Sequence, residues 1–251
     1  MSRVGGNLAK ASLRVKPEGL KPSQGYNLDN MKILHEDEHL LVLDKPAGLP
    51  VLPDGWEKDA PYLVKSLEEG YGRIFIVHRL DKVTSGVMVF ARDAETHRAL
   101  NIQFENHQAE KVYHAIVQGN PRWDEKTARH PLRANVGHKH RTMVDNKNGK
   151  PSETRFKILK RFQARPEQGR DDIALIEAKP MTGRTHQIRV HAYALGHPLL
   201  GDTLYGAEET DVIARPALHA YSLTIVMNGE PMAFKAPYPD DFRVALERLN
   251  R

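Results

Sequence analysis

The sequence predicts an α+β fold with a mixed, largely antiparallel central sheet and flanking helices and loops. Strand-like and helix-like stretches follow one another without strict β–α alternation, which argues against an all-parallel sheet. Two strand-like stretches, 219–227 and 230–237, are joined by Asn228-Gly229, a pair typical of the tight turn between antiparallel strands. The chain has 251 residues, of which 40% are hydrophobic, so it is long enough to bury one large core or two small ones.

The folded part is expected to begin near Ile33. Residues 40–53 should form a short apolar strand followed by a turn at Lys45-Pro46-Ala47-Gly48. Apolar residues recur at helical spacing over 60–69, so we expect a helix there that ends at Gly70.

The remaining strands are predicted from short stretches rich in apolar and β-branched residues. They are 74–77, 86–91, 111–119, 154–162, 173–180, 219–227 and 230–237. Three more helices are expected over 93–108, 185–196 and 239–250. The first has Asp93 as an N-cap and Glu95 in its first turn, and the second should stop at Gly196.

Two polar segments have no predicted core of their own. Residues 120–153 carry many cations and few apolar residues, and a loop of that length inside a compact chain is usually functional or disordered. Residues 1–32 are basic and contain scattered Gly, Pro and Ser, so we expect a flexible arm. The predicted organisation is therefore an arm over 1–32 and one folded domain over 33–251.

The composition excludes several kinds of site. Without cysteine the chain can form no disulfide, zinc–thiolate site or thiol nucleophile. No apolar run reaches the roughly 18 residues of a membrane span, and the first residues lack the apolar core of a signal peptide, so we expect a cytoplasmic protein. The net charge of +5 points weakly toward a polyanionic partner such as nucleic acid.

One carboxylate stands out in the stretch FIVHRLDKVTSGVMVFAR, residues 75–92. Asp81 lies between Arg79 and Lys82 in a polar loop with an apolar strand on each side, and Thr84-Ser85-Gly86 should form a tight turn. Taken alone, this acid is most simply a turn residue in a surface ion pair. A metal site with His78 lacks a second cluster of ligands, and a nucleophile at position 85 lacks the glycine-x-Ser-x-glycine elbow.

Two other segments hold candidate residues. On a helix starting near Thr185, His186 and Arg189 would share a face, either as a solvated basic surface or aimed at a specific group. Lys111 and Tyr113 alternate on one face of a strand, where strand packing is the simplest role for the tyrosine.

Three motifs in this order resemble those of the RluA-type RNA pseudouridine synthases. They are HRLDKVTSG (78–86), EKVYHAIVQG (110–119) and GRTHQIRVHAYALGHPLLGDTLYG (183–206), with further matches at LLVLDKPAGLPV (40–51) and FKAPYPDDF (234–242). The resemblance spans about 33–245 and implies a pseudouridine synthase catalytic fold. It also implies an isomerase that detaches uracil from its ribose in structured RNA and rejoins it through carbon 5, with no cofactor or metal.

The same resemblance implies roles for single residues. Asp81 matches the catalytic nucleophile, and Arg189 matches the arginine that pairs with it. Tyr113 matches the tyrosine that packs on the target base, and its phenol could take part in proton transfer. Arg79 matches the arginine that fills the gap left by the extruded uridine.

Further residues are expected at the RNA surface. Lys111 should support the pocket floor, and Arg184 should contact a phosphate or support the site. Cations of the 120–153 segment should follow the RNA backbone: Arg133, Lys139, Arg141, Lys147 and Lys150.

The chain resembles the compact members of the family, which have no N-terminal RNA-binding domain. Its expected partner is therefore ribosomal or transfer RNA, and a monomer is the default. Two other functions stay open from the residues alone: RNA binding without catalysis, and hydrolysis by His78 with Asp81.

Overall fold

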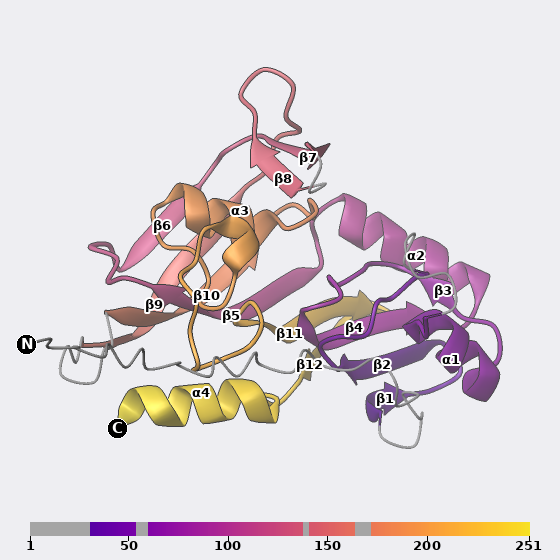
Figure 1. The fold of residues 1–251 in the computed structure, drawn as a ribbon. Helices are drawn as coiled ribbons and strands as arrows, with labels where there is room; N and C mark the ends of the chain where they lie inside the picture. Colours follow the sequence, from indigo (N-terminus) through magenta and orange to yellow (C-terminus); the bar gives the residue numbers. More distant parts are fainter. Residues whose placement is uncertain (1–30, 54–59, 138–140, 164–171) are drawn as a thin grey trace, which may run out of the picture.

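A computed structural model describes residues 31–53, 60–137, 141–163 and 172–251 (Figure 1). The predicted arm therefore lies outside the described residues except for its last two, and Lys32 already belongs to the first strand. The helices are α1 (Leu63–Tyr71), α2 (Ala94–Glu105), α3 (Gln187–Ala194) and α4 (Asp240–Asn250), with a 3-10 turn at Thr203–Tyr205. None of the described helices is both long and apolar enough to cross a membrane.

The strands lie in two sheets. They are β1 (Lys32–Glu36), β2 (Leu40–Lys45), β3 (Phe75–Ile76), β4 (Ser85–Ala91), β5 (Glu110–Gln118), β6 (Glu125–Ala128), β7 (Leu132–Val136), β8 (Arg141–Val144), β9 (Thr154–Phe162), β10 (Ile173–Pro180), β11 (Leu218–Met227) and β12 (Glu230–Lys235). Within the described residues, ten of them form one sheet and β7 pairs with β8.

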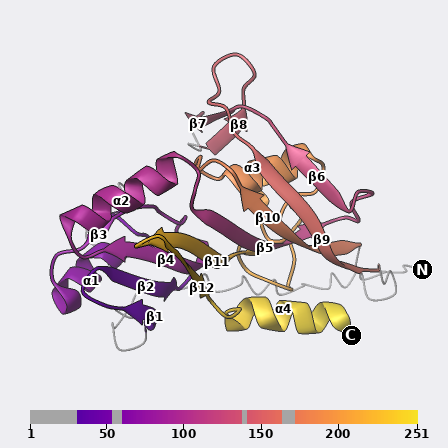
Figure 2. The same cartoon turned by 180° about the vertical axis from the view of Figure 1, so that it is seen from behind.

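The large sheet is mixed and mostly antiparallel, as predicted. Its order is β1-β2-β4-β11-β5-β10-β9-β6, with β3 beside β4 and β12 beside β11. Figure 2 shows β12 and β9 from behind. Only one pairing among the described strands is parallel, between β4 and β11, and it joins the two halves of the sheet through His219–Ser85 and Ala220–Gly86.

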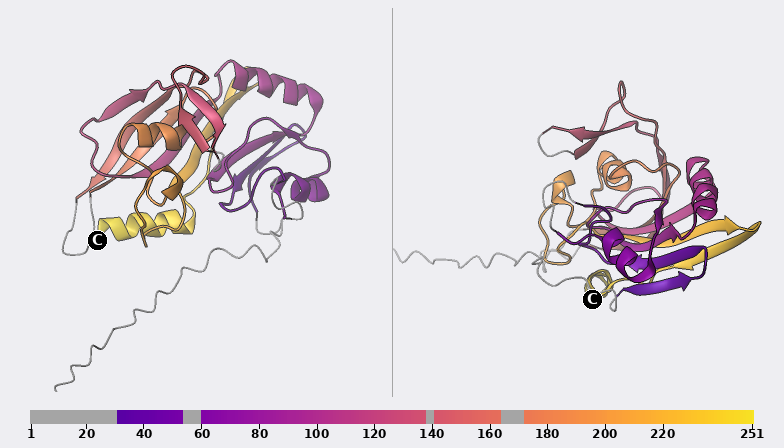
Figure 3. Two further views of the ribbon diagram at one scale, coloured as in Figure 1. Left: turned by 45° about the horizontal axis from the view of Figure 1, so that its top comes forward. Right: turned by 90° about the vertical axis from the view of Figure 1, so that its right-hand side faces the viewer.

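Helices cover both faces of the sheet because successive strand residues point to opposite sides. In β4, Met88 and Phe90 pack in the cluster that contains α1, whereas Val87 and Val89 pack in the cluster that contains Leu100 of α2. The residues of β5 alternate in the same way: those on one face pack in the cluster that contains α3, and those on the other face pack in the cluster that contains α4. Figure 3 shows α3 and the β7–β8 hairpin on one side of the sheet and α4 on the other.

Four local predictions are wrong. Residues 120–153 are not a single loop but contain β6, β7 and β8, whose few buried residues gave no strand pattern. The helix α1 runs through Gly70 and ends before Gly72, which has a positive φ of 72° at the helix C-terminus. The helix α3 begins at Gln187, because His186 has a positive φ of 53°. Lys45 belongs to β2 rather than to the turn that follows it.

A fifth prediction, for the stretch beside Asp81, is also wrong. Thr84-Ser85-Gly86 does not form the tight turn; Ser85 and Gly86 begin β4, and the turn lies one step earlier, where the Thr84 N–H donates to the Asp81 carbonyl at 3.0 Å. Gly86 has a φ of 118°, and a Cβ there would lie 2.2 Å from the carbonyl oxygen of Ala220. Glycine therefore serves the close approach of β4 and β11 rather than a turn.

Gly86→Ala is expected to lower the free energy of unfolding by about 3 kcal/mol or more, because backbone strain adds to a clash with a strand carbonyl. Gly72→Ala is the matched control, since Gly72 also has a positive φ but no atom within 4 Å of its Cβ position. The control should lose only the strain, about 1–2 kcal/mol. Urea unfolding of the two variants measures the difference, and equal losses would contradict the close-approach explanation.

Candidate active site

A cleft of about 840 Å³ opens where the two halves of the sheet meet. It is lined by the segment that follows β2, the Asp81 turn with its preceding loop, the end of α2, the start of β5, and the segment from β10 into α3. The three residues predicted to be catalytic, Asp81, Tyr113 and Arg189, all line this cleft. They come from three segments that are distant in the sequence.

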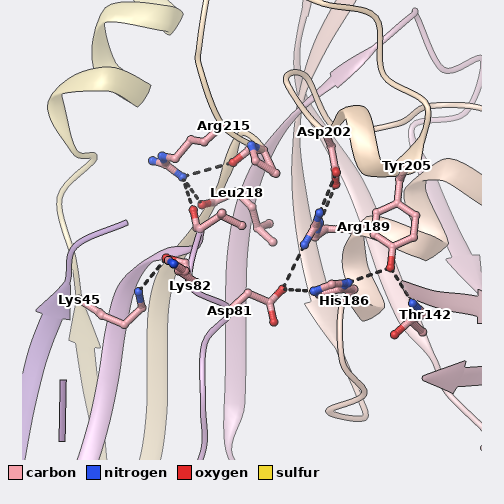
Figure 4. Close-up of polar contacts among 12 residues, drawn as sticks. Lys45, Asp81, Lys82, Thr142, His186, Arg189, Asp202, Tyr205, Arg215 and Leu218 are labelled. Carbon is pink, nitrogen blue, oxygen red and sulfur yellow. Dashed lines mark hydrogen bonds and ion pairs between the residues drawn. The ribbon is translucent and has the colours of Figure 1, made fainter. Parts of the chain in front are cut away.

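Two nitrogen atoms face the Asp81 carboxylate. Arg189 Nη1 and His186 Nε2 each lie 3.8 Å from Asp81 Oδ2 (Figure 4). These distances allow electrostatic attraction but exceed a hydrogen bond. Within the described residues the Asp81 carboxylate accepts no hydrogen bond, and the side chain is 27% exposed. The carboxylate therefore faces one positive and one polar group while part of it stays accessible.

Arg189 has a nearer partner than the predicted one. Its Nε and Nη2 donate to Asp202 at 2.6 and 2.8 Å, and both side chains are buried. Such a two-point pair fixes the plane of the guanidinium. The third nitrogen, Nη1, faces Asp81. The predicted pair between Arg189 and Asp81 is therefore present only as the 3.8 Å contact. Asp202 was not singled out from the sequence, although it lies within the third motif.

Tyr113 both packs in the core and lines the cleft. Its ring contacts two of the core clusters, one containing α1 and one containing α3, and thereby spans the junction between the halves. Burial, with the Asp81 charge acting in the same direction, raises the pKa of its phenol well above the usual range. At neutral pH the phenol is therefore protonated and can donate a proton or a hydrogen bond.

The predicted RNA-contacting residues fall into two groups. Arg79, Lys111 and Arg184 line the cleft, where Arg79 and Arg184 are exposed and burial lowers the pKa of Lys111. Arg133 and Arg141 lie outside the cleft on β7 and β8. Lys139 belongs to the residues that the structure does not describe.

The metal and hydrolase hypotheses both needed His78 to act together with Asp81. His78 instead accepts a hydrogen bond from the Val89 N–H at 3.1 Å and stacks on Phe104. Burial, with Lys111 acting in the same direction, lowers the pKa of His78 to about 3, so the ring is neutral. No group of three metal-binding side chains occurs among the described residues. Ser85 is 1% exposed and contacts His219 and Arg215 behind the cleft, so no substrate reaches it.

Two buried cations that the sequence analysis missed hold the Asp81 turn by its carbonyl groups. Lys45 Nζ donates to Pro46 and Leu49 at 2.7 and 2.8 Å and, at 3.4 Å, to Lys82. Arg215 donates to the Val83 carbonyl at 3.2 Å (Figure 4).

Arg215 also ties this turn to two other elements. It forms a two-point pair with Asp241 of α4, at 2.6 and 3.0 Å, and donates to the Leu218 carbonyl and to Ser85 Oγ. The loop that carries Asp81 is therefore anchored to β2 on one side and to α4 and β11 on the other.

The chain is similar to known proteins in both sequence and fold. A family model described as RNA pseudouridylate synthase matches residues 39–194. The dual-specificity RNA pseudouridine synthase RluA of Escherichia coli is 38% identical over 82% of this chain and 92% of its own length. The ribosomal large subunit pseudouridine synthase D of Nitrosomonas europaea is 35% identical over 87% of this chain and 65% of its own length. The structure of human RNA pseudouridylate synthase domain containing 1 superposes with a TM-score of 0.71 at 28% identity, covering 86% of each chain.

Proposed function

This chain belongs to the RluA-type RNA pseudouridylate synthase family, and from that membership we propose that it isomerises specific uridines in structured RNA with Asp81 as the nucleophile and the target base flipped out of its stack. The observation that carries the proposal is the meeting of Asp81, Tyr113 and Arg189 in one cleft. The reaction breaks the bond from N1 of uracil to C1′ of ribose and forms one from C5, while the hydrogen at C5 is lost and N1 regains one.

The proposed chemistry needs an ionised carboxylate near the ribose. The guanidinium of Arg189 and the ring of His186 both face Asp81 Oδ2, and we propose that they orient the carboxylate and direct Oδ1 to the substrate. Attack on the sugar, attack on the base and elimination to a glycal all start from this charged form. Tyr113, protonated at neutral pH, would lie under the base and donate where the reaction requires a proton.

Base flipping accounts for the cations at the mouth of the cleft. An extruded uridine leaves a gap in the RNA stack, and the exposed guanidinium of Arg79, next but one to Asp81, is placed to fill it. Arg184, which also lines the cleft, would contact a phosphate. RNA binding without catalysis would leave the meeting of Asp81, Tyr113 and Arg189 unexplained, so we do not adopt it.

The names of the relatives bear on the substrate. One is named a dual-specificity RNA pseudouridine synthase and another a ribosomal large subunit pseudouridine synthase. We propose that ribosomal RNA, transfer RNA or both contain the target. Incubating the purified protein with each RNA and mapping pseudouridine by carbodiimide primer extension should give modification at defined uridines, and a deletion strain should lack it there. If no RNA is modified and the deletion strain loses no pseudouridine, the proposal fails. Monomeric state and cytoplasmic location stay predictions.

The β7–β8 hairpin is proposed to clasp the RNA backbone. Replacing Arg133 and Arg141 together with glutamine should flatten the plot of log affinity against log salt by about 1.5, since each lost phosphate contact removes about 0.7–0.9. Arg243→Gln is the control, because Arg243 is an exposed cation on α4, across the sheet from the hairpin. An unchanged slope for the double variant would remove the hairpin from the interface.

A further inference from the structure

His186 occupies an unusual backbone position between two partners. It has φ 53° and ψ 20°, in the left-handed region, immediately before α3. This conformation brings its ring between Asp81 and Tyr205. Nε2 faces Asp81 Oδ2 at 3.8 Å, and Nδ1 lies 2.8 Å from the Tyr205 hydroxyl, with the two rings nearly perpendicular.

Tyr205 is a buried tyrosine with three polar neighbours. It ends the 3-10 turn and is 4% exposed. Its hydroxyl accepts a hydrogen bond at 3.0 Å from the backbone N–H of Thr142 on β8. Its ring lies under the guanidinium of Arg189, 5.0 Å away. Tyr205 thus touches the two residues that face Asp81 and the hairpin proposed to clasp RNA.

The hydrogen-bond partners of Tyr205 favour one neutral form of His186. Because the Thr142 N–H can only donate, the phenol oxygen is an acceptor there, and its own hydrogen can be donated to Nδ1 of His186. A neutral imidazole that accepts at Nδ1 has its hydrogen on Nε2. We infer that Tyr205 is a positioning residue that holds His186 in the Nε2–H form, aimed at Asp81. The inference rests on the proposed role of Asp81.

The charges around His186 favour this form. A lone pair on Nε2 would face a carboxylate and be repelled, whereas an N–H there is attracted. The charged groups that face the ring are Asp81, Arg189 and Asp202. Burial lowers the pKa of His186, while Asp81 opposes that shift, so the neutral ring is the form at neutral pH. The gap of 3.8 Å would close in the RNA complex, as hydrogen bonds in unliganded active sites often do.

Two donors would then converge on Oδ2, one from Arg189 and one from His186. That arrangement distinguishes the two carboxylate oxygens and leaves Oδ1 for the reaction. It also provides a structural link from the β7–β8 hairpin to the nucleophile, through the Thr142 N–H, the phenol and the imidazole. A shift of the hairpin on binding RNA would therefore reach Asp81 through a chain of hydrogen bonds.

The first test is a measurement on the unmodified protein. Long-range ¹H–¹⁵N spectra of the histidine side chains distinguish the two neutral forms, and loss of a signal in His186→Gln assigns it. The expected result is the Nε2–H form for His186. In the opposite form, Nδ1–H donates to Tyr205 and the phenol donates to Oγ1 of Thr142, which has no other partner among the described residues; that result would overturn the inference.

The second test removes the phenol oxygen alone. Tyr205→Phe keeps the ring under Arg189 and should slow single-turnover pseudouridine formation about tenfold, with RNA affinity unchanged and the His186 spectrum shifted toward a mixture of forms. Tyr193→Phe, at a 53% exposed tyrosine on α3, is the control and should change neither. Wild-type turnover and an unchanged spectrum in Tyr205→Phe would overturn the inference.

A double variant separates positioning from simple structural damage. The side-chain amide of glutamine at position 186 can donate toward Asp81 without help from the phenol. The cost of Tyr205→Phe should therefore disappear in a His186→Gln background, whereas a purely structural role would give the same cost in both backgrounds. These results are distinguishable from failure of the proposed function. The activity is refuted if the wild type modifies no RNA, and the role of Asp81 is refuted if Asp81→Asn keeps full turnover, whatever the state of His186.

Discussion

Asp81→Asn is expected to abolish pseudouridine formation, with a loss of at least about 10⁴-fold in single-turnover rate. Asparagine has nearly the shape of aspartate but carries no charge and cannot serve as the nucleophile. The turn should persist, because Lys45 and Arg215 hold its carbonyl groups rather than the Asp81 side chain. RNA affinity should therefore stay close to that of the wild type, as measured by filter binding.

The matched control is Asp240→Asn, at a 94% exposed acid on α4 that also loses one negative charge. It should turn over normally. Substantial turnover by Asp81→Asn would show that the carboxylate is not the nucleophile, and would redirect attention to Tyr113. Loss of both turnover and RNA binding would instead point to a binding role for the charge.

Arg189→Ala should cost both stability and activity, for separate reasons. Removing the guanidinium leaves Asp202 charged and unpaired in the core, which typically costs about 3–5 kcal/mol. It also removes the positive charge beside Asp81, so turnover should fall even in the fraction that stays folded. Urea unfolding measures the first effect, and single-turnover kinetics measures the second.

A double variant separates the two effects. Arg189→Met with Asp202→Leu replaces the buried ion pair with apolar side chains, a change that is often neutral for stability. We expect its free energy of unfolding to approach that of the wild type while its turnover stays as low as in Arg189→Ala. If the double variant turns over normally, the charge of Arg189 has no part in the reaction.

The sequence was informative where apolar periodicity follows secondary structure. The buried residues of the central strands form patterns that can be recognised in the sequence, such as the seven consecutive buried residues of β4. The strands within 120–153 could not be predicted in this way, because β7 is mostly exposed and pairs with β8 outside the large sheet. The backbone geometry of His186 and Gly86 depends on residues that are close in space but distant in the sequence. The neighbouring residues in the sequence therefore do not predict it.

The residues of the cleft were also only partly predictable from the sequence. Asp81, Tyr113 and Arg189 were identified through motifs, and their meeting in one cleft needed the fold. Asp202, Lys45 and Arg215 were missed because a charged residue is normally expected on the surface. Their burial depends on partners far away in the chain, such as Asp241 for Arg215.

The anchoring of the Asp81 turn through its main chain separates two properties of that position. The fold depends on the carbonyl groups of Lys82 and Val83, whereas the proposed chemistry depends on the Asp81 carboxylate. A catalytically silent side chain can therefore be installed without disturbing the surface that recognises RNA. Such a variant would act as a substrate trap: it would retain its natural RNA from a cell extract, so that sequencing the bound RNA identifies the target.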